Sequence, residues 1–257
     1  MWPRFDAAKS FEPMQPLAPA SFARGLPAAE AAQHLYACIQ EMAERQTNPV
    51  LEVLQGATCV EWERRYPPEH LRFGGACLRA FYHCHRAPGK SADEHGHFHV
   101  FVRAPQAADT LEHWTHVAGL SMDMLGQPLG WHAVNRWVSG GLWQQAEKIV
   151  MLLDRVEIPP GTVLIERWLG AMLRLFRPEI VDLLSRRDRE LSRLGASRAA
   201  TDILADHAVY ALAAQPVDLL ARLGSLLAAN AEKTAGRRVA DGQSDAGRIG
   251  RNSLRAL

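Results

Sequence analysis

The sequence predicts an α+β fold, in which a four-stranded antiparallel β-sheet (a meander) packs with helices from the N-terminal and C-terminal parts of the chain. Apolar and polar side chains alternate in segments of residues 78–138, which is the period of a strand. From Leu142 onward the apolar positions recur about every 3.6 residues, as in helices. Strands in one block followed by helices in another are typical of the α+β class.

Composition divides the chain into three parts. Four prolines and little periodicity indicate an irregular N-terminal arm over residues 1–26. Residues 234–257 are rich in glycine, serine, aspartate and arginine, which predicts a disordered tail. Residues 27–233 are expected to form a single α+β domain, with helices within 28–65, the sheet within 78–138 and a helical part within 142–230.

Two helices are predicted before the sheet, near 28–46 and 49–65. Pro27 suits the first turn of a helix, and the acidic side chain of Glu30 suits the positive end of the helix dipole. Proline interrupts the pattern at Pro49, and the run Tyr66-Pro67-Pro68 is expected to end the second helix.

The sheet is predicted to begin with a hairpin between residues 78 and 103. A short helix over 109–113 leads to a third strand near 115–123, and a fourth strand follows near 131–138. Breaks at proline and glycine then separate five helices, which we expect near 142–156, 162–176, 178–194, 198–213 and 216–230.

The hairpin holds five of the eleven histidines of the chain, at alternating positions. These are His83, His85, His95, His97 and His99. Residues two apart on a strand point to the same face, so the five imidazoles share one face if odd residues pair with odd ones, as in His83 with His97 and His85 with His95. Opposed side chains then lie about 5 Å apart at Cβ.

This arrangement predicts a divalent metal centre. We expect His83, His85, His97 and His99 to be the ligands, because three or more imidazoles that leave a coordination position open suit a catalytic metal ion. Zinc, iron and copper all accept imidazole, so the identity of the metal stays open. His95 or Glu94 is expected to act as a further ligand, a hydrogen-bond partner of a ligand, or a general base.

A resemblance supports a metal-free alternative. The segment His95-Gly96-His97-Phe98-His99-Val100-Phe101 resembles the histidine-triad pattern, which implies phosphoryl or nucleotidyl transfer with His97 as nucleophile, flanked by His95 and His99. Gly96 stands at a hydrophobic position of that pattern, and the Gly-Gln-Ser run that leads into it is absent.

Two further interpretations concern the metal. In outline, the HxH spacing on a strand is similar to the first cupin motif, but the glutamate and distal histidine of that motif are not at the cupin spacing. A closed site with four protein ligands would instead make the protein a non-catalytic metal-binding or structural module. The sequence leaves open whether His113, His116 and His132 join the centre.

Charge and hydropathy narrow the function classes. A net charge of +1 gives no field that would attract nucleic acid or an anionic membrane. No apolar run is long enough to span a bilayer and no export signal is visible, so we expect a cytoplasmic protein. From the predicted histidine centre we expect a metal-dependent enzyme, either a hydrolase or an oxidoreductase, that acts on a small-molecule substrate. The substrate and the oligomeric state are not indicated.

Overall fold

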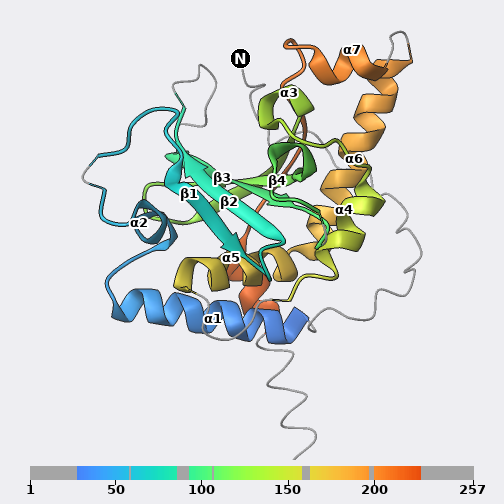
Figure 1. Cartoon of the computed structure of the whole chain (residues 1–257). Coiled ribbons are helices and arrows are strands. Elements are labelled where there is room, and N and C mark those ends of the chain that lie inside the picture. Colours follow the sequence, from blue (N-terminus) through green and yellow to red (C-terminus); the bar gives the residue numbers. More distant parts are fainter. Residues whose placement is uncertain are drawn as a thin grey trace, which may run out of the picture.

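The structure is a computed structural model of the whole chain (Figure 1). It describes residues 28–57, 59–85, 93–105, 107–157, 163–196 and 200–226. The expected arm over residues 1–26 and the expected tail over 234–257 lie outside these described residues.

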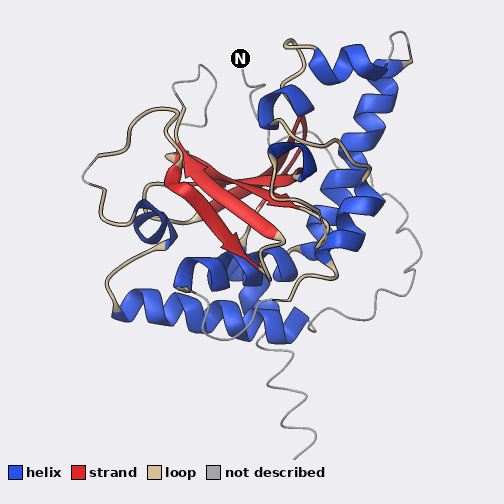
Figure 2. Cartoon of the chain, viewed as in Figure 1, coloured by secondary structure: helices blue, strands red, loops and turns tan. Residues whose placement is uncertain are grey.

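A single antiparallel sheet runs through the centre of the described fold (Figure 2). Each strand pairs with its neighbours in sequence, so the sheet is a meander in the order β1-β2-β3-β4-β5-β6. The α+β prediction is confirmed, but the predicted number of four strands is wrong, since the sheet has six. The strands are β1 (Tyr66–Phe73), β2 (Leu78–His83), β3 (Gly96–Val102), β4 (Thr115–Met122), β5 (Pro128–Val134) and β6 (Ala211–Pro216).

Helices lie before β1, between β3 and β4, between β5 and β6, and after β6. They are α1 (Ala28–Glu44), α2 (Pro49–Leu54), the 3-10 helix η1 (Leu111–His113), α3 (Arg136–Ser139), α4 (Ala146–Leu153), α5 (Leu164–Leu175), α6 (Arg177–Gly195) and α7 (Ala200–Ala205), and residues 219–226 are also helical. The helix predicted over 49–65 is therefore shorter than expected, and the strand predicted over 131–138 turns into α3 after Val134. Among the described residues, no helix is long and apolar enough to cross a membrane.

β1 is the first strand that the sequence prediction missed. Its prolines, Pro67 and Pro68, suggested only the end of a helix. The register of β1 against β2 shifts between Tyr66 and Leu71, so the prolines fall in an irregular part of an edge strand. Proline is tolerated there because an edge strand does not need every backbone N–H for pairing.

β6 is the second missed strand. Its sequence, Ala211–Pro216, is rich in alanine and was expected to continue a helix. Pairing with β5 overrides that preference, with Trp131 opposite Gln215. Arg186 of α6 fixes the strand from the side, since its guanidinium donates to the carbonyl of Ala214 at 2.9 Å and to Oε1 of Gln215 at 2.8 Å. Tertiary contacts thus decide the conformation of this segment.

The apolar face of the sheet forms the main core. α5 lies between the sheet and α1 (Figure 1), and Trp168 of α5 packs on Phe98 of β3 with ring centroids 6.1 Å apart. α6 covers β5 and β6 at the other end of the sheet. Burial of the large side chains on this face supplies the hydrophobic stabilisation that holds the opposite, polar face in place.

Asn135 joins the end of β5 to α7 and to the segment between α7 and β6. Its side chain is fully buried and donates to the carbonyls of Ile203 at 2.7 Å and Val209 at 3.1 Å. Its Oδ1 accepts the N–H of Arg136 at 2.8 Å and so caps α3. All donors and acceptors of this amide have a structural use.

We expect the substitution Asn135→Ala to lower the free energy of unfolding by about 1–3 kcal/mol, because it leaves buried backbone groups without a partner. Urea denaturation measures this change. Ser225→Ala, which removes an exposed hydroxyl that bonds only within its own helix, is the matched control and should change little. Equal stabilities for the two variants would contradict the role given to Asn135.

Candidate metal centre

The register of the β2–β3 hairpin brings the histidines together. His83 lies opposite His97 and Phe81 lies opposite His99, so odd residues pair with odd ones as predicted. We call the side of the sheet that carries these residues the histidine face. His85 follows the end of β2 and is not part of the regular pairing.

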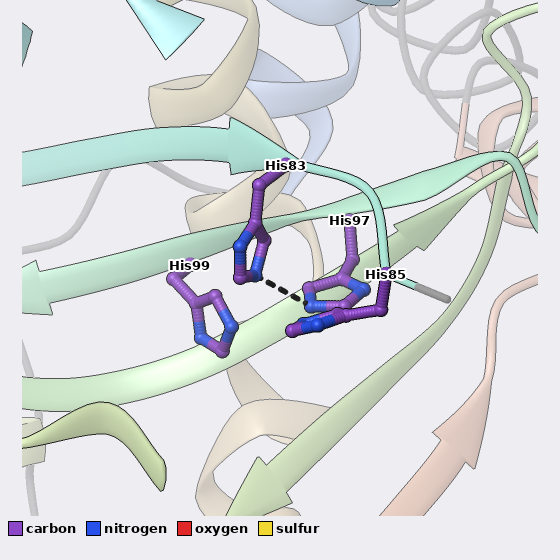
Figure 3. A group of neighbouring side chains, drawn as sticks. All are labelled: His83, His85, His97 and His99. Carbon is purple, nitrogen blue, oxygen red and sulfur yellow. Dashed lines mark hydrogen bonds between the residues drawn. The ribbon is translucent and has the colours of Figure 1, made fainter. Parts of the chain in front are cut away.

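Four imidazoles gather at this place (Figure 3). His83, His85, His97 and His99, here called the four-histidine group, each offer one nitrogen, and these nitrogens all lie within 4.8 Å of one another. Nε2 of His83 and Nε2 of His97 are 3.0 Å apart. The group has the donor type and the spacing to hold one metal ion.

Glu94 supports His97 from outside the group. Its Oε1 lies 2.9 Å from Nδ1 of His97, while Nε2 of the same ring faces His83. A carboxylate on one ring nitrogen fixes which nitrogen is left for a metal, and it makes that nitrogen a better donor. His97 is 1% exposed, so the ring has a fixed place in the fold.

His95 lies on the other side of the sheet, contrary to the predicted alternation. Nδ1 of His95 is 2.7 Å from the hydroxyl of Tyr82, a fully buried residue of the apolar face. The alternation breaks because β3 begins only at Gly96. A Cβ atom at Gly96 would lie 2.5 Å from that hydroxyl, so glycine leaves the space in which Tyr82 reaches His95.

His116 joins the histidine face through a β-bulge. Val100 pairs with Ala118 but Phe101 pairs with His116, which leaves Val117 as an extra residue on β4. With this extra residue, His116 lies opposite Phe101 and shares its face of the sheet. Nε2 of His116 therefore meets Nδ1 of His99 at 2.8 Å.

His132 reaches the same face from β5. It pairs with Gly119, and its ring centroid lies 5.1 Å from that of His97. Nδ1 of His132 is 3.3 Å from Oγ of Ser121. His113, in contrast, lies in η1, where its Nδ1 is 2.8 Å from Oγ1 of Thr110.

Aromatic side chains close one end of the histidine face. Phe81, Phe101 and Trp114 form a small apolar cluster of their own, and Phe81 contacts both His83 and His99. The guanidinium of Arg79 lies 4.6 Å from the ring centroid of Phe101. The arginine thus packs on the aromatic cluster and does not project freely into the centre.

Burial favours the neutral form of His99, His116 and His132. It holds the pKa of His99 and of His116 well below the usual value, and nearby imidazoles, among them His97 beside His99 and His132 beside His116, lower both further. Burial, followed by the nearby His85, lowers the pKa of His132 to about 4. Neutral imidazole is the form that binds a metal ion.

Comparison with known proteins gives a family but no activity. Residues 29–217 match the family described as "Domain of unknown function (DUF6969)". Neither the curated proteins nor the solved structures contain a match to the chain.

The buried imidazoles predict that the metal-free protein loses stability as the pH falls. Protonation is easier in the unfolded chain, where histidine titrates near 6.5, than in the folded state, where His132 has a pKa of about 4. The unfolded state therefore binds more protons between these values, and acid favours it. We expect His132 alone to contribute about 3 kcal/mol to the loss at low pH.

Urea denaturation of metal-free protein at several pH values between 7 and 4 measures this dependence. A variant that replaces the exposed His34 by alanine should retain the same profile, because His34 lies on the surface of α1. A free energy of unfolding that stays constant down to pH 5 would contradict the predicted proton uptake.

Proposed function

Since the chain belongs to the DUF6969 family, a domain of unknown function, we propose from its histidine centre that the protein is a metal-dependent enzyme. The four-histidine group would bind one divalent transition-metal ion, and a small-molecule substrate would react at a free position of that ion. The observation that carries the proposal is the approach of four imidazole nitrogens from two adjacent strands to within 4.8 Å of one another.

The contact between two rings of the group is compatible with one shared ion. Two nitrogens bound to one ion at about 2.1 Å lie about 3.0 Å apart at a right angle and about 3.4 Å apart at the tetrahedral angle. Nε2 of His83 and Nε2 of His97 are at hydrogen-bond distance, 3.0 Å apart, so both nitrogens could bind the same ion in place of that hydrogen bond.

The number of donors favours a metal that accepts more than four ligands. Four imidazoles fill the coordination of tetrahedral zinc, which is then a structural ion without a free position. An ion that accepts six ligands keeps two positions for water, dioxygen or substrate. We therefore favour an oxidoreductase over a hydrolase, and we assign no substrate.

In this proposal Glu94 acts on the metal through His97. Its carboxylate holds Nδ1 of the ring, so Nε2 would remain the donor atom, and this contact supports a role for Glu94 as a positioning residue rather than as a general base. His95 has no direct part in the reaction, because its imidazole bonds with Tyr82 on the apolar side of the sheet.

One observation favours a non-catalytic metal site as the second candidate. His97 and His99 are 1% and 3% exposed, which is the burial expected of a closed structural centre. The two candidates differ in the free coordination position. A small anion such as azide can bind the metal in an enzyme of the proposed type, but it cannot bind a closed four-histidine zinc site.

The histidine-triad interpretation has less support. It requires His95, His97 and His99 to act together, and His95 lies on the opposite side of the sheet from His97. We therefore base the proposed reaction on a metal ion.

Metal analysis of protein purified without a histidine tag tests the proposal. We expect about one equivalent of a divalent transition metal per chain, and its loss from the double variant His97→Ala, His99→Ala, because that variant removes two of four donors. The single variant His34→Ala, which changes an exposed histidine far from the group in sequence, should keep the metal.

Circular dichroism of the double variant shows whether the fold survives the substitutions. Azide added to the metal-loaded protein should change the absorption spectrum of the ion, since a free position is available. No metal uptake by folded wild-type protein would refute the metal centre. A bound metal whose absorption spectrum does not change on addition of azide would support the structural alternative.

We expect Glu94→Gln to weaken metal binding by roughly 10–100-fold while the fold is unchanged, because the neutral amide polarises the ring of His97 less than the carboxylate does. Competition with a chelator of known affinity measures this effect. Glu69→Gln, an exposed carboxylate on β1, serves as control. Equal affinities for the two variants would show that Glu94 does not tune the metal.

A further inference from the structure

The residues of one row across the sheet make room for His132. His99 on β3 lies opposite Gly119 on β4, and Gly119 lies opposite His132 on β5. A Cβ atom at Gly119 would lie only 2.0 Å from Nε2 of His132 and 2.4 Å from its Cε1. The imidazole of His132 therefore takes the space that a side chain at position 119 would occupy.

From this position His132 faces the four-histidine group. Its ring centroid lies 5.1 Å from that of His97 and 6.1 Å from that of His99. Oγ of Ser121 is next to Nδ1, whereas Nε2 is the atom above Gly119, the residue between His132 and His99. Nε2 thus lies on the side of the ring that faces β4 and β3.

We propose that His132 is a fifth metal donor, through Nε2, at the centre inferred above. This proposal rests on the proposed function, since it needs an ion in the four-histidine group. Gly119 is the residue that permits it, because any side chain at that position would displace the ring of His132.

His116 has a different role, although it is also buried on this face. Its Nε2 meets Nδ1 of His99 at 2.8 Å, so it bonds with another ring and does not face the group with a donor atom. His116 therefore orients His99, as Glu94 orients His97.

Five imidazoles make the centre selective. They exceed the four ligands of tetrahedral zinc, and on an ion that accepts six ligands they leave a single position. The centre would then bind iron or a similar ion and admit one end-on ligand, such as dioxygen or one atom of a substrate. A substrate that chelates the metal through two atoms would not fit.

Cobalt(II) titration of metal-free protein tests the fifth donor, because the visible absorption of cobalt reports its coordination number. Tetrahedral cobalt absorbs more strongly than five- or six-coordinate cobalt. We expect weak absorption from the wild-type complex, and a stronger spectrum together with at least about tenfold weaker binding from His132→Ala.

Gly119→Ala should shift the spectrum in the same direction as His132→Ala, since the added methyl group displaces the ring without changing any ligand. Gly224→Ala is its control, because a methyl group there meets nothing within 4 Å. If Gly119→Ala does not fold, the double variant with His132→Ala removes the clash and should bind cobalt as His132→Ala does.

The outcomes separate the two proposals. No cobalt binding by folded wild-type protein would refute the metal centre and, with it, the fifth donor. Tight binding with the same spectrum and affinity in wild type and His132→Ala would overturn the fifth donor alone. Loss of all binding in the His97→Ala, His99→Ala variant confirms that the cobalt occupies the four-histidine group.

Discussion

The pairing of His83 with His97 is the contact on which the centre depends. It fixes the register of the hairpin. If the pairing were shifted by one residue, the histidines of one strand would point into the apolar core. The register is maintained from the other face, where Tyr82 packs on Phe98 with ring centroids 5.0 Å apart. The hydrophobic core thus determines the geometry of the polar face that carries the imidazoles.

Most of the centre could be predicted from the sequence because strand alternation is a local property. The HxH spacing of His83 and His85 and that of His97 and His99 predicted that these four imidazoles share one face, and the register of the hairpin is the one that the shared face requires. The exception was His95, where the strand has not yet begun and the alternation does not hold.

What could not be predicted depends on contacts between segments far apart in the chain. The bulge at Val117 turns His116 toward His99, and the sequence of β4 contains no pattern that predicts this bulge. The position of the His132 ring can be predicted from Gly119 only once the strand pairing is known, since a glycine opposite His132 leaves space for a ring. The same reason explains β6, whose alanines form a strand only because β5 and α6 hold them there.

The prolines of the sheet also limit how this protein can associate with others. β1 and β6 are the edges of the sheet, and they contain Pro67, Pro68 and Pro216. A proline has no backbone N–H to offer an incoming strand. Addition of a further strand is therefore opposed where these prolines lie, on both edges of the sheet.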